Sequence, residues 1–345
     1  MRLLKRILQV FTLLLIAFIL YNLSAVNYGL QQGLGQAKLL LSVREVDEML
    51  ADSSTADSIK QKFQLIAAIK KFSSEELGLS KTDNYTTFYD QKGKPILWTV
   101  KASPEFKIEA YEWQFPIAGS FPYKGFFEIE KAKEEEEQLK KQGYDTNIDE
   151  VSAWSTLGWF RDPILSSMLE RSPGRLAELI IHESTHATLY LKDSAQFNEN
   201  LASFIGRKGA EQFLAFHYGI NSPEQTNYQD RLKRNEIFRN YMQEAIVNLS
   251  SNYQKMDSSL NIEEKRQLKT RWINELKTGL AKSDYYENDS VAAISLESFH
   301  PNNAYFSGFN TYADEIPELE KQLNQKFNRD LKAMISSFKS KGFSL

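Results

Sequence analysis

The chain has 345 residues, of which 42% are hydrophobic and 25% are charged, and its formal net charge is −3. These values are typical of a folded body with a substantial core, and without a basic excess we expect no nucleic-acid partner. Cysteine is absent, which excludes a disulfide framework and a lipid-attachment cysteine.

The N-terminal segment differs in composition from everything that follows it. Residues 1–6 form a basic tip, and 16 of the 20 residues from 7 to 26 are apolar. A run of that length can cross a bilayer as a helix, and the positive-inside rule places the tip in the cytoplasm. We therefore expect residues 7–26 to be an uncleaved signal anchor in the bacterial inner membrane, with the body in the periplasm. A cleaved signal peptide is the alternative, although Leu23-Ser24-Ala25 is a poor cleavage site.

The next part of the chain changes from a helical to a strand period. Apolar residues recur at helical spacing from about 28 to 79, which predicts a helical scaffold. From 85 to 127, short β-branched and aromatic runs predict a small antiparallel sheet, with a hairpin turn at Asp90–Pro95. The acidic run Glu134–Glu137 is interpreted as the solvated face of a helix, because charge runs on helices usually face water.

The segment from Leu176 to Tyr190 contains the pattern H-E-x-x-H. On a helix, His182 and His186 lie on one face and can bind one metal ion, and Glu183 can act on a water molecule as general base. The apolar neighbours place this helix mostly inside the protein, where two imidazoles and a carboxylate need a partner. The sequence therefore predicts a zinc site. Two buried histidines satisfied by hydrogen bonds are the alternative.

A catalytic zinc site needs a third protein ligand and one open position. A turn at 192–194 leads into a second helix, expected from about Ala195 to Ile205, and Glu199 lies one turn into it. Glu199 is therefore the candidate third ligand. The alternatives are Glu178, four residues before His182, and an acidic residue from a distant segment. Glu178 is the weaker choice, because one helix cannot easily direct three ligands at a tetrahedral ion.

Beyond Gly206 the chain is predominantly helical to about residue 283, and a final helix pair is expected between Pro317 and Phe343. Between these parts, Tyr305 or Tyr312 could donate a hydrogen bond to a tetrahedral oxyanion. His217 and His300 are interpreted as ordinary residues.

Substrate contacts are also expected ahead of the motif helix. Zinc peptidases commonly bind the substrate backbone as an extra strand beside an edge strand, and the segment Val151–Gly158 is the candidate. Its candidate substrate-binding residues are Ser155, Thr156 and Gly158.

From about Tyr28 to Tyr312 the chain resembles a bacterial family of predicted aminopeptidases within the gluzincin-like zinc peptidases. The H-E-x-x-H motif is followed, at the family's spacing, by Phe197-Asn-Glu-Asn-Leu-Ala202. The resemblance implies that His182, His186 and Glu199 bind the metal and that Glu183 is the base. It rests further on the segments Trp98-Thr-Val100, Ser103-Pro-Glu-Phe106, Trp113–Gly119, Pro122–Phe126, Gly143–Asp145, Ser155–Trp159, Asp162-Pro163 and Asn302–Ala304.

The chain departs from this family at its cysteines. Family members usually carry a cysteine pair where this chain has Gln114 and Ser120, which indicates the loss of a local bridge. Many also have a lipoprotein cysteine near the N-terminus, so any membrane attachment here would depend on residues 7–26.

The sequence thus predicts a mainly α, α+β fold: a zincin-like peptidase body with a small antiparallel sheet, preceded by one transmembrane helix. The expected function is hydrolysis of peptide bonds in peptide or protein substrates with one Zn²⁺ ion, as an aminopeptidase. An endopeptidase of the same chemistry and a non-catalytic, membrane-tethered scaffold stabilised by zinc are the alternatives, and the intact Glu183 argues against the scaffold. Residues 27–345 are expected to form one peptidase domain, made of a scaffold (27–80), a sheet and helix (85–160), the active-site helices (172–206) and a helical C-terminal part (207–345).

Overall fold

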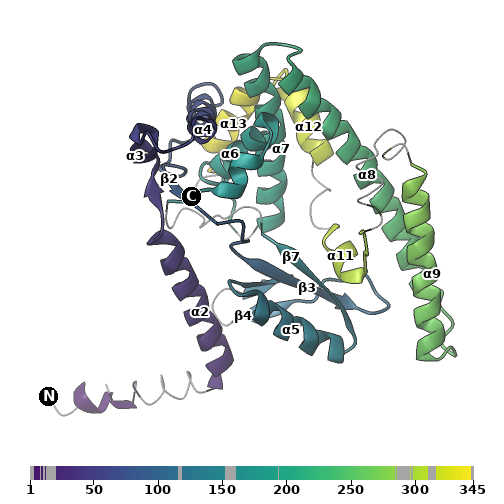
Figure 1. Ribbon diagram of the computed structural model, residues 1–345. Coiled ribbons are helices and arrows are strands. Elements are labelled where there is room, and N and C mark those ends of the chain that lie inside the picture. Colours follow the sequence, from purple (N-terminus) through teal and green to yellow (C-terminus); the bar gives the residue numbers. More distant parts are fainter. Residues whose placement is uncertain are drawn as a thin grey trace.

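The computed structural model describes residues 4–7, 9–10, 12, 21–115, 119–151, 161–192, 194–283, 285, 296, 298–309 and 316–342. Over these residues the fold is mainly helical α+β with small sheets, as the sequence predicted (Figure 1). The helices are α2 (Leu23–Leu40), α3 (Val46–Ala51), α4 (Asp57–Glu75), α5 (Ile129–Lys141), α6 (Pro173–His186), α7 (Ala195–Tyr218), α8 (Pro223–Gln254), α9 (Ile262–Ala281), α11 (Asn303–Ser307), α12 (Ile316–Lys326) and α13 (Leu331–Ser340). The strands are β1 (Arg44–Glu45), β2 (Thr87–Tyr89), β3 (Trp98–Pro104), β4 (Trp113–Phe115), β5 (Gly119–Phe121), β6 (Lys124–Phe126), β7 (Tyr144–Glu150) and β8 (Ile164–Leu165).

The strands form separate sheets with different neighbours. In one, β2 pairs antiparallel with β1 and parallel with β8; in another, β3 lies between β6 and β7 and is antiparallel to both. The hairpin expected around Asp90–Pro95 is therefore wrong, because β2 and β3 belong to different sheets. Burial explains the split: Phe88 on β2 packs against Phe63 of α4, whereas Val100 on β3 lies in a second apolar cluster with Leu139 of α5.

The strands β4 and β5 form a two-stranded sheet of their own. Gln114 faces Ser120 across it, and the Gln114 amide donates a hydrogen bond to the Ser120 hydroxyl at 3.1 Å. These are the two positions at which the resemblance implied a cysteine pair, so a side-chain hydrogen bond stands where that local bridge would link the strands.

The largest hydrophobic cluster encloses α6. Leu176, Ile180 and Ile181 of α6 are fully buried, and Phe63 of α4 and Phe213 of α7 pack into the same cluster. Burying a side chain of this kind contributes about 1.5–3 kcal/mol. The helix that carries H-E-x-x-H is therefore held inside the body, as its apolar flanks predicted.

Helix α2 lies along one side of the molecule and packs on the sheet of β3 (Figure 1). Both the Tyr28 hydroxyl and the Gln32 amide donate hydrogen bonds to the carbonyl oxygen of Gly125, at 2.9 and 3.0 Å. Gly35 allows the close approach, because a Cβ at this position would overlap the ring of Phe127.

The expected membrane anchor over residues 7–26, and with it the inner-membrane location with a periplasmic body, is corrected. In the part of the chain that the structure describes, no helix has both the length and the apolar character needed to cross a membrane. A spanning helix needs about 20 mainly apolar residues; α2 overlaps the end of the expected anchor but soon carries Gln31, Gln32 and Gln36. Residues 8, 11 and 13–20 lie outside the described residues.

A buried polar cluster attaches the C-terminal helices to the sheet. Lys269 of α9 contacts both carboxylate oxygens of Asp145 on β7, at 2.7 and 2.6 Å, and the backbone N–H of Asn303 on α11 donates to the same carboxylate at 2.9 Å. The Asn303 amide donates to the carbonyl oxygens of Pro104 and Glu105, and its oxygen accepts from Tyr253. Three segments of the resemblance thus meet in a structural cluster.

Candidate metal centre

Helix α6 places the two histidines of the motif one turn apart on one face. Their imidazole rings are nearly perpendicular, with centroids 4.7 Å apart, and the two Nε2 atoms are separated by 3.1 Å. His186 is buried and His182 is partly buried. Both rings therefore present the same nitrogen to one point beside the end of α6.

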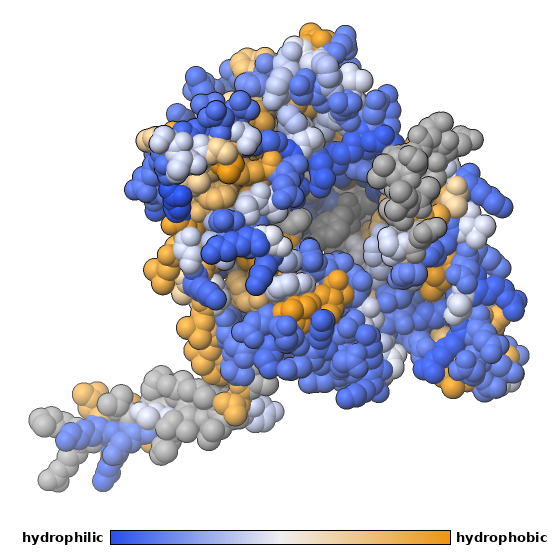
Figure 2. All heavy atoms as spheres, viewed as in Figure 1, coloured by the Kyte–Doolittle hydropathy of each residue, from blue (hydrophilic) through white to orange (hydrophobic). Residues whose placement is uncertain are grey.

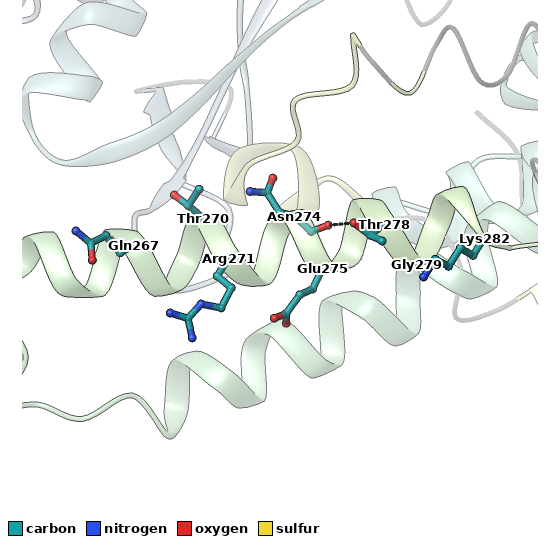
Figure 3. A pocket seen from close by; sticks show the side chains of 8 residues that line it. All are labelled: Gln267, Thr270, Arg271, Asn274, Glu275, Thr278, Gly279 and Lys282. Atoms are coloured by element: carbon teal, nitrogen blue, oxygen red, sulfur yellow. Dashed lines mark hydrogen bonds between the residues drawn. The ribbon is translucent and has the colours of Figure 1, made fainter.

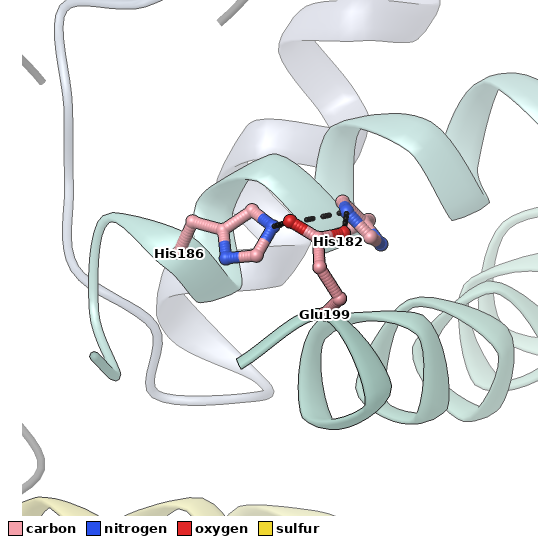
Figure 4. Close-up of side chains that lie close together, drawn as sticks. All are labelled: His182, His186 and Glu199. Carbon is pink, nitrogen blue, oxygen red and sulfur yellow. Dashed lines mark hydrogen bonds and ion pairs between the residues drawn. The ribbon is translucent and has the colours of Figure 1, made fainter. Parts of the chain in front are cut away.

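The connection between α6 and α7 brings Glu199 to that point. Asn198 closes it: its side-chain oxygen accepts from the Leu191 N–H, and its amide donates to the Leu191 carbonyl oxygen, both at 2.8 Å. With the connection fixed in this way, Glu199, one turn into α7, is directed back over the histidines (Figure 4). One expected turn residue, Asp193, lies outside the described residues.

Close packing of the two helices sets the position of Glu199. A Cβ at Gly206 would lie 2.9 Å from the Glu178 carbonyl oxygen and 3.2 Å from the His182 Cβ, so only glycine fits there without displacement. Ala202, between Glu199 and Gly206 along α7, is fully buried. The expectation that this helix ends at Ile205 is wrong, since α7 continues to Tyr218. Glycine in a helix costs about 1 kcal/mol, which the helix contact here offsets.

The donor atoms of the three residues lie close enough together to hold one metal ion, all within 4.8 Å of one another. Glu199 Oε2 lies 3.5 Å from His182 Nε2, and Glu199 Oε1 lies 3.3 Å from His186 Nε2 (Figure 4). With metal–ligand bonds of 2.0–2.1 Å, a tetrahedral zinc separates its ligands by about 3.3 Å. Two imidazole nitrogens and one carboxylate at these distances can therefore bind a metal ion. Among the described residues, these three form the group of side chains that could do so.

Electrostatics favour opposite charges within the cluster when no ion is bound. Burial raises the pKa of Glu199, but the hydrogen bonds with His182 and His186 outweigh it and hold that pKa well below its usual range. Burial lowers the pKa of His186, but the hydrogen bond and charge of Glu199, helped by the charge of Glu183, outweigh it and raise that pKa. The pocket thus stabilises an ionised carboxylate beside cationic imidazole, and a divalent cation would supply the same positive charge.

Glu183 is not one of the converging donors. Its Oε2 atom is buried and makes no hydrogen bond in the structure. The Nδ1 atom of His186 is likewise buried without a hydrogen bond. Buried polar atoms are usually paired, so a buried carboxylate oxygen without a hydrogen bond, next to a ligand cluster, marks a candidate functional group. Tyr85 lies nearby: burial raises its pKa, and the charge of Glu183 raises it further.

The rival third ligand, Glu178, is occupied elsewhere. Its carboxylate pairs with the guanidinium of Arg231 on α8 and with that of Arg207 on α7, the latter at 3.6 Å. These contacts direct Glu178 toward the two arginines of α7 and α8 and not toward the histidines. The structure therefore brings Glu199, and not Glu178, beside the two histidines.

Among the expected substrate contacts, Tyr305 lies within the described residues. Ser155, Thr156, Gly158 and Tyr312 lie outside the described residues. Tyr305 packs among aromatic rings, with centroids 5.2 Å from Phe299 and 5.6 Å from Phe309, in the apolar cluster of α8 and α9.

Sequence reasoning missed a tyrosine that the structure brings near the ligands. Tyr123 is in the turn between β5 and β6 and is 41% exposed. Partial desolvation of its hydroxyl raises its pKa, and the charge of Glu199 raises it further. The only signal in the sequence was its place in the segment Pro122–Phe126, which carried no chemistry by itself.

A hollow lies along α9, and none of the residues of the candidate metal centre lines it. It has a volume of about 680 Å³, and its polar groups include the Thr278 hydroxyl, which donates to the Asn274 carbonyl oxygen at 2.8 Å (Figure 3). All of its lining residues come from α9 and its C-cap, so they form an open surface and do not converge as the α6–α7 residues do. They are Gln267, Thr270, Arg271, Asn274, Glu275, Thr278, Gly279 and Lys282.

The fold and the cluster thus define a mainly helical protein with a site of two histidines and one glutamate that could hold a metal ion. The family model described as "Putative aminopeptidase" matches residues 27–341, and the chain therefore belongs to this family. Its description indicates a peptidase acting on peptides. Comparisons with curated proteins and with solved structures gave no match.

Proposed function

We propose that this protein is a zinc-dependent aminopeptidase with a zincin-like catalytic body. The observation that carries the proposal is the convergence of three side chains beside the unpaired Oε2 of Glu183. The two histidine Nε2 atoms lie 3.1 Å apart, and each lies 3.3–3.5 Å from one of the two carboxylate oxygens of Glu199. Family membership supports the reaction class, and the two nitrogens and one carboxylate are the ligand set used by many catalytic zinc sites.

The three donors would hold the ion, and the protein's other residues would do the remaining work. When bound, Zn²⁺ acts as a Lewis acid and lowers the pKa of a water molecule toward neutrality. Glu183 follows His182 directly, so its free oxygen can accept the proton of the attacking water. The same carboxyl group then donates that proton to the amine that leaves. A general base and acid of this kind accelerates hydrolysis by about 10²–10⁴-fold.

The arrangement favours a catalytic over a purely structural zinc. Structural zinc sites are closed by four protein ligands, whereas a catalytic site keeps one position open. In the part of the chain that the structure describes, three donors converge, and the acidic residue beside them is not one of the three. A structural ion would not require an unpaired Glu183.

The proposal is tested with the full chain, zinc and two peptide libraries, one with free and one with blocked N-termini. We expect cleavage of free-amine peptides that a chelator abolishes and added zinc restores. Equal cleavage of blocked peptides would replace the aminopeptidase with an endopeptidase of the same chemistry. Tight zinc binding with no hydrolysis of either library would contradict an enzymatic function and favour the zinc-stabilised scaffold.

A further inference from the structure

Helix α2 has two faces of different character. Tyr28, Gln32 and Leu39 face the body, where the first two bind the Gly125 carbonyl oxygen and Leu39 is 3% exposed. On the opposite side, Leu23, Leu30, Leu34 and Leu41 are 59%, 62%, 71% and 87% exposed. At 100° per residue these four leucines lie within about 40° of one another around the helix axis. They therefore form one apolar stripe that the described body leaves open.

The stripe is visible on the surface. In Figure 2 a hydrophobic column runs down the left side of the molecule, at the place that α2 occupies in Figure 1. Exposed apolar surfaces of this extent on a folded protein usually mark a contact with a partner.

The spacing of the stripe is that of a heptad repeat. If Leu30 is given position d, the a and d positions of the helix and its cap are all exposed, and none faces the body. We propose that α2 pairs with α2 of a second copy of this chain as a parallel two-stranded coiled coil. Its seam consists of Leu23, Asn27, Leu30, Leu34, Ala37 and Leu41.

The polar member of the seam indicates that the partner is a second copy. Asn27 is at an a position, and in a parallel pair a positions meet their own copies, so the two amides can hydrogen-bond to each other. Against a lipid surface or an antiparallel helix, this amide would meet apolar groups and lose its hydrogen bonds. An asparagine at a single a position is known to fix the register and the number of strands.

Charge does not oppose the pairing. The helix carries no acidic residue in its first turn, and its basic residue, Lys38, lies at an e position beside the seam. In a parallel pair, that position faces the g position five residues earlier in the partner, which is Gly33. Like charges therefore do not meet, and Gly33 leaves room for the lysine side chain.

Attachment to the body prepares α2 for the interaction. A free helix of 18 residues is only marginally stable in water, but α2 is held by Tyr28, Gln32 and the contact at Gly35. The conformational entropy needed to order this helix is therefore lost on folding and not on association. A seam about 27 Å long is still small, and we expect weak, concentration-dependent dimers.

The absence of cysteine from the natural chain allows a direct test in the full-length protein. Single variants Asn27→Cys and Leu30→Cys should form disulfide-linked dimers under mild oxidation. A disulfide requires Cα atoms about 4.4–6.8 Å apart, and the proposed seam brings each of these positions next to its own copy. Gln32→Cys, which faces the body, and Phe216→Cys, which is 68% exposed on α7, are the matched controls and should stay monomeric. Cross-linking of the seam variants no faster than of Phe216→Cys would overturn the proposal.

A second measurement separates lost association from misfolding. Leu30→Glu combined with Leu34→Glu should keep the thermal unfolding midpoint, because both side chains are exposed. In sedimentation the double variant should remain monomeric at roughly ten times the concentration at which half of the natural chain is dimeric. This corresponds to a loss of at least about tenfold in dimer affinity. If the natural chain stays monomeric and instead binds phosphatidylcholine vesicles through this stripe, the occupant is lipid and the dimer is excluded. None of these results depends on zinc or on peptidase activity.

Discussion

Two polar clusters inside this molecule differ in whether all of their polar groups are hydrogen-bonded. In the cluster of Asp145, Lys269 and Asn303, carboxylate, ammonium and amide groups satisfy one another at 2.6–3.1 Å. In the cluster on α6 and α7, Oε2 of Glu183 and Nδ1 of His186 are buried without a hydrogen bond, and the remaining donors surround a single point. A satisfied cluster stabilises the fold, whereas an unsatisfied one costs stability and is retained where a ligand or a proton is to be bound.

The largest effect is expected when the unsatisfied cluster loses a ligand. His182→Ala should abolish both stoichiometric metal binding and peptide hydrolysis, while the protein stays folded, because His182 is partly exposed and at the edge of the core. Metal analysis of the purified variant, together with circular dichroism, checks this. Full zinc content in His182→Ala would place the metal elsewhere.

The satisfied cluster should respond in the opposite way. Lys269→Ala leaves Asp145 as a largely enclosed carboxylate without its cation, its side chain being 15% exposed. Breaking a buried pair costs about 3–5 kcal/mol of unfolding free energy, and we expect a loss toward the lower end of that range. Denaturant unfolding measures the loss. Per folded molecule, zinc affinity should be unchanged, since Lys269 contacts Asp145 on the sheet and not the α6–α7 residues. If Lys269→Ala had unchanged stability but altered zinc affinity, the Asp145 cluster would not be the structural one of the two.

A smaller effect distinguishes the two candidate third ligands. Glu199→Ala should weaken zinc affinity at least about tenfold, the lower end of the losses caused even by residues behind the ligands. Glu178→Ala should leave zinc affinity nearly unchanged, because Glu178 pairs with Arg231 and Arg207. Metal titration of both variants decides between them, and the opposite ranking would remove Glu199 from the site.

The smallest effect concerns pH in the metal-free protein. The raised pKa of His186 adds stability that is fully present below the unfolded-state pKa of about 6.5 and is lost as pH rises through the folded-state pKa. The lowered pKa of Glu199 adds stability present above about 4.3 and lost on acidification. Stability of the chelated protein should therefore fall as pH rises above about 6.5. The zinc-saturated protein is the control and should not show this fall, because zinc binds neutral imidazole.

Local patterns predicted the parts of this molecule that local geometry determines. Residues four apart on a helix share a face, so the convergence of His182 and His186 followed from the motif, and the short connection to Glu199 made that residue the preferred neighbour. The continuation of α7 through Gly206 was missed, since glycine signals a helix end in sequence but serves close packing here.

Contacts between distant segments were not predictable. Lys269 and Asn303 lie 124 and 158 residues from Asp145, and no local pattern indicates that they meet. The wrong hairpin at Asp90–Pro95 has the same cause, because β2 and β3 are each paired with strands from elsewhere in the chain. The anchor over 7–26 was inferred from the apolar run and the basic residues before it, and it is wrong because no helix among the described residues is long and apolar enough to cross a membrane.

The central claim is that Glu183 supplies chemistry and not structure, and the Glu183→Gln variant tests it most directly. Zinc content and kcat are measured on the same preparation, with the natural chain alongside. We predict that zinc remains stoichiometric while kcat falls by about 10²-fold or more, because the amide keeps the shape of the side chain but cannot take up the proton. Full activity in Glu183→Gln, or loss of its zinc, would contradict the account.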